Sequence, residues 1–459
     1  MGTGLFTLCP ITTPGTELFS IATPLTAVLD SARLADTCAG CYDSRRPIDD
    51  GSGELKACTR CRVVRYCGRN CQLKDWRFAH SLECSIFGKL HPRILPNNVR
   101  AVLRIVLRYK HKKCTADEFQ AFLKLSHAQS DQQRGKREDI RLAARAVKEY
   151  SGVADMDEGL IASLFTRLDV NTFNLVTYDY TPIGLYLDPY SSLMNHSCAY
   201  NAIVVFDGDR MTVKSTRPMR LDEQVFVSYI DTTYCVSTRR RQLRQRYGFE
   251  CECVKCTEEA RSGGLLEELV AAEAAGEQLV ATASQQVQDD NARIQKYTTG
   301  LNTIRQKMPS SSHSHLTKQP LVALRNELIV SLINAARYDD AWIQCAIEYL
   351  KIDPVLYPHR GHPLRRIHAW RLAKLTASTD QAHLARRFSV DPAVVLWHVL
   401  QWLVDGESEA CSAPLLQAQI RAMYAEVSQM GPNMRMEWPA VEERLEDALQ
   451  SELAMGVDG

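Results

Sequence analysis

The spacing of apolar residues separates strand-like from helix-like stretches of the chain. Residues 1–30 alternate apolar and polar positions between Pro and Gly, which predicts short strands and turns. Residues 167–250 carry strand-like runs at 202–206, 211–214 and 224–229. Residues 87–166 instead repeat apolar positions at helical spacing. A helix in this region would place five apolar residues on one face: Val99, Val102, Leu103, Val106 and Leu107.

Residues 263–459 are rich in Ala, Leu, Glu and Gln, which predicts helices throughout this region. Asp391-Pro392 begins one of them, with Pro at the first helical position. The stretch 321–350 predicts two helices joined near Tyr338, and repeated hairpins of this kind indicate a small α-solenoid. The polar stretches 130–137 and 308–318 predict surface loops.

Composition indicates a soluble globular protein with more than one domain. The chain has 459 residues, of which 45% are hydrophobic and 24% are charged. A formal net charge of +1 gives no general attraction for nucleic acid or an anionic membrane. No apolar run is long enough to cross a membrane, and the N-terminus lacks the pattern of a secretory signal. We therefore expect no membrane partner and no nucleic-acid partner.

Sixteen cysteines, most of them in short C-x-x-C type groups, indicate metal ligation in a reducing compartment. Eight ligands come in four pairs within 31–86, which is enough for two closed tetrahedral zinc sites. The C-x2-C pairs are tight knuckles, and the two i,i+4 pairs would each lie on one face of a helical turn. Spacing alone permits sequential or interleaved pairing. The pairs are Cys38 with Cys41, Cys58 with Cys61, Cys67 with Cys71, and His80 with Cys84.

A second group of motifs follows in a fixed order. Asn195-His196-Ser197-Cys198 is followed by Asn201, and then by Ser228-Tyr229-Ile230-Asp231. Tyr247-Gly248-Phe249 comes next, directly before Cys251, Cys253 and Cys256. Each fragment alone fits an ordinary polar loop or strand end, so the combination and its order carry the signal.

These motifs resemble those of the SET and MYND domain-containing protein lysine methyltransferases. The tract CAGCYD…CTRCRVVRYCGRNCQLKDWRFAHSLEC resembles a MYND finger, and the second group resembles a SET core with its post-SET cysteines. Asn171-Thr172-Phe173 and the helical tail are also similar to that family. The resemblance implies an α+β fold with a β-rich, knotted SET core. A MYND finger and a helical insert interrupt the core, and an all-helical TPR-like domain follows it.

The resemblance also implies domain boundaries. They are an N-terminal SET segment at 1–30, a MYND finger at 31–86, a helical insert at 87–166, a catalytic core at 167–250, a post-SET zinc segment at 251–262 and a helical domain at 263–459.

The resemblance implies three structural zinc ions. Interleaved pairing would give one ion Cys38, Cys41, Cys67 and Cys71, and a second ion Cys58, Cys61, His80 and Cys84. Cys198 would complete a third site with Cys251, Cys253 and Cys256. The remaining cysteines are expected to be ordinary core or surface residues; they are Cys9, Cys114, Cys235, Cys345 and Cys411.

The implied activity is transfer of a methyl group from S-adenosylmethionine to a lysine of a histone or another protein. Phe173, Tyr229 and Tyr247 would line the lysine channel, where desolvation lowers the pKa of the lysine and the hydroxyls orient its amine. Tyr229 would also contact the methyl donor. The other implied donor-binding residues are Gly2, Gly4, Asn195, His196 and Phe249.

The sequence departs from the family pattern at three places. The glycine pair Gly2 and Gly4 follows only Met1, Tyr200 stands where the family usually has Pro, and Asp222-Glu223-Gln224 replaces Gly-Glu-Glu. A turn that tolerates Asp accommodates the last change.

A non-catalytic adaptor is the alternative function. MYND fingers are interaction modules, often for proline-rich peptides, so the finger and the helical tail could bind protein partners without catalysis. In either case we expect a monomer in the cytoplasm and nucleus. The arginine run from Arg239 to Arg246 is expected to be a solvated helix face.

Overall fold

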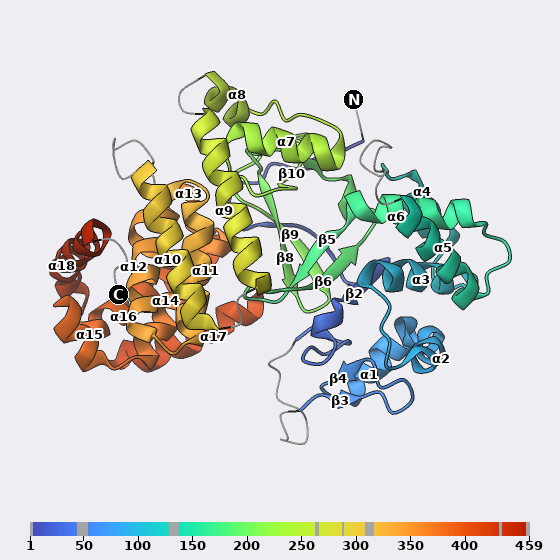
Figure 1. Ribbon diagram of the computed structural model, residues 1–459, viewed down its shortest axis with the longest axis horizontal. Helices are drawn as coiled ribbons and strands as arrows, with labels where there is room; N and C mark the ends of the chain where they lie inside the picture. Colours follow the sequence, from blue (N-terminus) through green and yellow to red (C-terminus); the bar gives the residue numbers. More distant parts are fainter. Residues whose placement is uncertain are drawn as a thin grey trace.

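The computed structural model describes residues 3–43, 54–127, 137–261, 266–286, 289–307, 316–430 and 434–455. Gly2 and most of both predicted polar loops, at 130–136 and 308–315, lie outside the described residues. Small sheets occupy the centre of the molecule, with a bundle of helices on one side and a second helical group on the other (Figure 1).

Two three-stranded sheets combine the N-terminal segment with strands far along the chain. β1 (Glu17–Ile21) pairs antiparallel with β9 (Arg210–Ser215), which also pairs with β8 (Ala202–Asp207). β2 (Thr26–Leu29) pairs antiparallel with β6 (Pro182–Leu187), and β5 (Phe173–Val176) forms the other edge. The segment before β3 therefore belongs to the same unit as residues 173–215. This confirms a core that is interrupted in sequence.

Two shorter strand pairs complete the β structure. β7 (Asn195–His196) runs parallel to β10 (Phe226–Val227), and β3 (Lys56–Ala57) pairs with β4 (Arg65–Tyr66). The runs at 202–206 and 211–214 are confirmed as β8 and β9. The run at 224–229 was predicted too long, because only Phe226 and Val227 pair as strand residues while Gln224 forms an isolated bridge with Phe6.

Helices fill the stretch between β4 and β5, as predicted. α1 (Arg69–Asp75), a π-helical turn (Trp76–His80) and α2 (Ser81–Leu90) form one continuous helical path. The helices that follow are α3 (Asn97–Lys110), α4 (Ala116–Lys124), α5 (Arg137–Ser151) and α6 (Glu158–Asn171).

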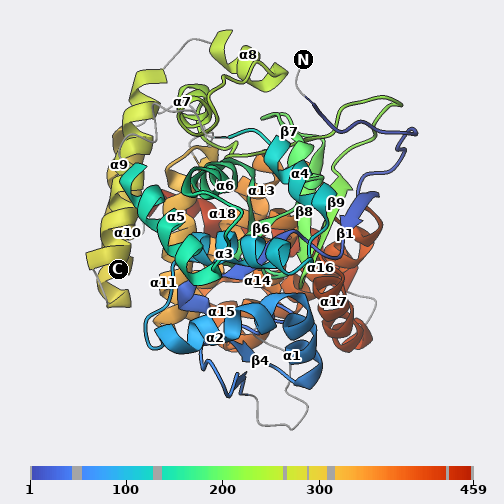
Figure 2. The ribbon, with the colours of Figure 1, turned by 90° about the vertical axis from the view of Figure 1, so that its right-hand side faces the viewer.

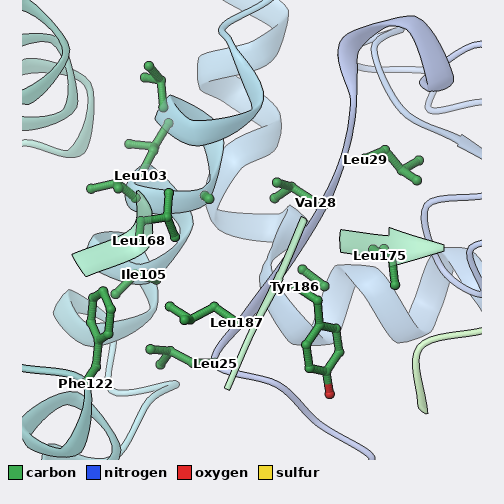
Figure 3. Close-up of a cluster of buried hydrophobic side chains, with 14 of the residues drawn as sticks. Leu25, Val28, Leu29, Leu103, Ile105, Phe122, Leu168, Leu175, Tyr186 and Leu187 are labelled. Carbon is green, nitrogen blue, oxygen red and sulfur yellow. The ribbon is translucent and has the colours of Figure 1, made fainter. Parts of the chain in front are cut away.

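Helix α3 passes through the main core. Its apolar residues Leu103 and Ile105 are fully buried near Leu187 of β6 and Leu25, the residue before β2 (Figure 3). The helix is also buried on its polar side, which the apolar pattern did not predict. Arg100, Arg104 and Arg108 are each no more than 6% exposed.

These three arginines donate hydrogen bonds to backbone carbonyls along the outer edge of β2 and the residue before it. Arg100 donates to the carbonyl of Leu29 at 2.7 Å, Arg104 donates to that of Ala27 at 2.6 Å, and Arg108 donates to that of Leu25. The match has a geometric cause. Four residues of helix rise about 6 Å, and two residues of strand about 6.6 Å, so arginines four apart reach alternate carbonyls.

The C-terminal region is helical wherever it is described. Pro392 begins α16, and the Asp391 side chain caps it by accepting from the N–H of Ala393 at 2.9 Å, as predicted. The hairpin predicted at 321–350 is confirmed by α11 and α12, and a π-helical turn (Glu348–Ile352) extends α12.

The other helices pack around one apolar core. The bounds are α9 (Leu266–Gln286), α10 (Asp290–Lys307), α11 (Leu321–Asn334), α12 (Tyr338–Ile347), α13 (Asp353–Leu356), α14 (Pro363–Ser378), α15 (Gln381–Phe388), α16 (Pro392–Asp405), α17 (Pro414–Val427) and α18 (Met434–Met455).

Two helices remain between the sheets and this region, α7 (Val236–Tyr247) and α8 (Val254–Arg261). They lie at the opposite end of the molecule from β3, β4, α1 and α2 in both ribbon views (Figures 1 and 2). The two groups of cysteines are therefore far apart. Among the described residues, no helix is long and apolar enough to cross a membrane.

Candidate functional site

The cysteine-rich segment forms two four-ligand clusters. Their ligand atoms lie within 4.8 Å of one another in each cluster, a spacing that suits one tetrahedral zinc ion per cluster. The pairing is interleaved, which sequence spacing had left open. One cluster contains Cys38, Cys41, Cys67 and Cys71, and the other contains Cys58, Cys61, His80 and Cys84.

Local structure explains how these ligands converge. His80 and Cys84 lie on consecutive turns of the continuous helical path, as their spacing predicted. Cys67 was expected to share a helical turn with Cys71, and that expectation is wrong. Gly68 is extended and caps α1, so Cys67 precedes the helix and its sulfur reaches that of Cys71 at 3.4 Å from outside.

The third cluster joins Cys198 to Cys251, Cys253 and Cys256, with the same mutual spacing. Arg239 is fully buried beside it and donates to the Cys256 sulfur at 3.4 Å and to Glu259 at 2.9 Å. The Cys198 thiol and the Arg239 guanidinium lower the pKa of Cys256 to about 5, which favours the thiolate that zinc binds. The solvated face predicted for the arginine run is therefore wrong for Arg239.

His196 connects this cluster to Tyr229. Its Nδ1 accepts the backbone N–H of Tyr229 at 3.0 Å, and its Nε2 lies 3.3 Å from the Cys198 sulfur. Burial and the charge of Arg239 lower the pKa of His196 to about 4, so the imidazole is neutral. A neutral ring that accepts at Nδ1 carries its hydrogen on Nε2, which then donates to the sulfur. The predicted donor-binding histidine thus fixes the backbone of the predicted catalytic tyrosine.

Aromatic side chains gather around His196. The ring centroids of Tyr229 and Tyr247 are 4.8 Å apart, and Phe249 lies 5.9 Å from His196. Gly248 permits this arrangement, because it ends α7 with φ 77°, a left-handed conformation that favours glycine. The chain reverses there, and Tyr247 and Phe249 meet the same group of rings from either side of the turn.

Phe173, Tyr229 and Tyr247 line one cavity of about 130 Å³, as the predicted channel requires. They come from the start of β5, the segment after β10 and the end of α7. The Tyr229 hydroxyl donates to the carbonyl of Met194, which orients it. Burial raises the pKa of both tyrosines, so both hydroxyls remain protonated donors at neutral pH. Met194 and Arg246 also line the cavity, although the sequence motifs gave neither residue a role in the reaction site.

Gly4 and Asn195, both implied donor-binding residues, lie beside each other. The Asn195 amide donates to the carbonyl of Thr3 at 3.1 Å. A Cβ added to Gly4 would lie 2.1 Å from the amide nitrogen of Gln224 and 3.1 Å from that of Asn195. Gly4 therefore packs against the side-chain ends of Asn195 in β7 and of Gln224, two residues before β10. Gly2 lies outside the described residues.

A model of the MYND finger family matches residues 35–84. SET domain and MYND-type zinc finger protein 6 of Schizosaccharomyces pombe is 33% identical over 229 residues, which cover 50% of this chain and 44% of that protein. Histone-lysine N-methyltransferase SMYD3 of Mus musculus is 28% identical, covering 58% of this chain and 61% of its own length. N-lysine methyltransferase SMYD2 of Gallus gallus is 30% identical, covering 52% and 55%.

This chain is similar to SET and MYND domain proteins over about half of its length. It spans 44% to 61% of the length of these three curated relatives. A solved structure of the SET domain of LSMT, bound to lysine and AdoHcy, aligns with 95% of this chain and 88% of that one at 13% identity, with a TM-score of 0.25. The relationship confirms that the first two clusters belong to a MYND finger.

A second cavity, of about 490 Å³, lies between the segment that the MYND finger model matches and residues 22–24 and 209. Its apolar wall includes Tyr42, Phe78 and Leu73, and the last of these is 38% exposed. Lys74 and Asp209 form an ion pair at its edge, with 2.6 Å between nitrogen and oxygen. No prediction from the sequence located this cavity, because its walls come from four separate segments.

Proposed function

We propose that the chain is an S-adenosylmethionine-dependent protein-lysine methyltransferase that acts on a histone or another protein. One observation carries the proposal: Phe173, Tyr229 and Tyr247 converge on a single cavity beside Asn195 and His196. Several curated relatives are named histone-lysine or N-lysine methyltransferases, which supports this reaction class.

The methyl donor would be held by Gly4, Asn195, His196 and Phe249. The ring of Phe249 beside His196 suits stacking on a nucleoside base, and Gly4 lies next to Asn195 in the same region. When bound, the donor supplies an electrophilic methyl group to the substrate amine. The third zinc cluster keeps Phe249 near His196, because Cys251 follows Phe249 by two residues.

The aromatic cavity prepares the substrate lysine. An ammonium group loses hydration among Phe173, Tyr229 and Tyr247, which lowers its pKa and favours the neutral amine that can attack. The tyrosine hydroxyl oxygens then accept the N–H groups of that amine and leave its lone pair free, since the Tyr229 hydrogen is donated to Met194. The Met194 carbonyl fixes the Tyr229 hydroxyl before the substrate arrives, so little reorganisation is needed during the reaction.

Tyr229→Phe is expected to lower the rate of methyl transfer by about 10²-fold, because it removes one preorganised hydroxyl. The assay follows labelled methyl groups from S-adenosylmethionine into histones or a cell lysate, and calorimetry measures donor binding in parallel. Tyr338→Phe is the matched control, since Tyr338 is 41% exposed on the far helical region. Absence of both transfer and donor binding in the wild-type protein would contradict the proposed function.

A second proposed function is binding of a proline-rich peptide in the cavity beside the MYND finger. Proline-rich segments dock in aromatic-lined grooves, and Tyr42 and Phe78 line this cavity together with the partly exposed Leu73. The two cavities lie on different parts of the chain, so the two functions are compatible.

Leu73→Asp is expected to weaken binding of a fluorescent proline-rich peptide about 10-fold, because it places a charge in the apolar wall. Fluorescence anisotropy measures the affinity. Leu142→Asp serves as control, because Leu142 is 56% exposed on α5 outside this cavity. Equal affinity of the wild-type protein and Leu73→Asp would count against this site.

The compartment and the oligomeric state are further parts of the proposal. We place the protein as a monomer in the cytoplasm and nucleus. None of the sixteen cysteines forms a disulfide, which suits compartments that keep thiols reduced.

A further inference from the structure

Two side-chain contacts join the C-terminal helical region to the loops that flank Tyr229, and we propose that they hold the reaction site in its working geometry. His362 and Gln319 are then positioning residues, which act through Tyr200 and the turn at 231–233. The inference rests on the proposed methyltransferase function and adds to it a dependence of rate on the helical region.

The first contact joins Tyr200 to His362. The Tyr200 hydroxyl lies 3.0 Å from Nε2 of His362, which is 5% exposed at the start of α14. The His362 ring stacks on Tyr357, with 4.3 Å between centroids and 12° between planes. Burial lowers the pKa of His362 to about 3, so the ring is neutral and stays in place as a hydrogen-bonding partner.

The segment that contains Tyr200 is bonded closely to the segment that contains Tyr229. The Asn201 side chain donates to the carbonyl of Gln224 at 2.8 Å and accepts the N–H of Phe226 at 2.8 Å. Further along, the Tyr229 N–H donates to His196. A restraint on Tyr200 is therefore transmitted to Tyr229 through short, rigid connections.

The second contact lies on the other side of Tyr229. The Gln319 amide donates to the Thr233 hydroxyl at 2.8 Å and to the Asp231 carboxylate at 3.3 Å. Gln319 is 3% exposed, and its carbonyl oxygen accepts the N–H of Ala323 in the first turn of α11 at 3.2 Å. Helix α11 thus orients the amide that holds the turn two residues after Tyr229.

The helical region can serve as a fixed support, because it also packs directly on the sheets. Lys214 of β9 donates to the carbonyl of Ala410 at 3.0 Å, and the Cys411 thiol donates to the carbonyl of Ser215 at 3.3 Å. A Cβ on Gly15 would lie 2.6 Å from the carbonyl carbon of Glu409, so backbone packs on backbone there. Movement of the helical region would accordingly displace both loops around Tyr229.

Tyr200→Phe tests the first contact, because it removes the hydroxyl and retains the ring. We expect kcat to fall about 10-fold, since small displacements of reacting groups have large effects on rate. The KM for the protein substrate is expected to change by less than about 2-fold, because the change affects orientation more than binding. His362→Phe added to Tyr200→Phe should cause no further loss, because the partner hydroxyl is already absent.

Tyr424→Phe is the matched control. Its hydroxyl donates to Gln401 within the helical region, away from both flanking loops, so its removal should cost stability without the fall in kcat. Gln319→Met tests the second contact in the same assay, and we expect a similar fall in kcat. Melting temperatures of all variants separate loss of folding from loss of positioning.

Hydrogen exchange gives a readout that does not depend on activity. The amides of Ser197, Asn201 and Tyr229 are bonded between the two segments, and they should exchange faster in Tyr200→Phe than in Tyr424→Phe. Unchanged exchange and unchanged kcat would overturn the inference, as would an equal fall in kcat in Tyr424→Phe. If the wild-type protein transfers no methyl group, the proposed function fails, and exchange alone decides the positioning role.

Discussion

Cys256→Ala is expected to reduce methyl transfer by at least about 10²-fold and to lower the zinc content from three ions to two per chain. Cys256 is fully buried on α8 and shares its cluster with Cys198, which follows Asn195 and His196, the residues proposed to bind the donor. Without the fourth thiolate, the post-SET segment loses its bond to the core. Tyr247 and Phe249 then leave their positions, and displacement of about 1 Å is enough for a loss of this size.

Cys235→Ala provides the control for this loss. Cys235 lies at the start of α7, close in sequence to the same segment, and its sulfur belongs to none of the three clusters. It should retain three zinc ions and the wild-type rate. Mass spectrometry of the native protein counts the ions, and the labelled-donor assay gives the rate. A Cys256→Ala protein that keeps three ions, or keeps its rate with two, would show that the third cluster does not support the reaction site.

The zinc ligands could be predicted from sequence because their spacing is a short-range property. Knuckles such as Cys38-x2-Cys41 and the i,i+4 pair of His80 and Cys84 bring two ligands together within one turn of chain. Which pairs share an ion is instead a long-range property. The interleaved arrangement depends on how β3, β4 and α1 fold over one another; spacing left it open, the family resemblance implied it, and the structure confirms it.

Residues whose partners are distant backbone atoms could not be predicted. The pattern of α3 shows Arg100, Arg104 and Arg108 as polar positions on a helix, which ordinarily indicates a solvent face. Their partners are carbonyls of β2 and the residue before it, more than 70 residues earlier in the chain. The solvent face was also wrong for Arg239, whose partners are the side chains of Cys256 and Glu259.

The residues around the reaction cavity also divide into those that the sequence motifs predicted and those that they did not. Motif order identified Phe173, Tyr229 and Tyr247, because these positions carry the resemblance to the SET family. Met194 orients the Tyr229 hydroxyl through its backbone carbonyl, so the identity of its side chain does not indicate this role. Tyr200 and His362 are 162 residues apart in the sequence, so no local sequence pattern predicts their contact.

Arg104→Ala is expected to destabilise the protein by about 3–5 kcal/mol, because it leaves a buried charge without its partner. Arg104 donates from Nε and Nη2 to the two carboxylate oxygens of Glu83 at 2.7 and 2.8 Å, and both side chains are no more than 7% exposed. The same guanidinium bonds the carbonyl of Ala27. Glu83 precedes the zinc ligand Cys84, so the ion pair also fixes α2, which carries that ligand, against α3.

Urea titration measures the free energy of unfolding, and Arg141→Ala is the control. The pair of Arg141 with Glu138 on α5 has both side chains more than 70% exposed, so its loss should cost less than about 1 kcal/mol. Replacing both members of the buried pair, with Arg104→Met and Glu83→Leu, should recover part of the stability, since an apolar pair leaves no isolated charge. A small effect of Arg104→Ala, similar to that of Arg141→Ala, would mean that water reaches Glu83 and that the finger does not depend on this ion pair for its attachment.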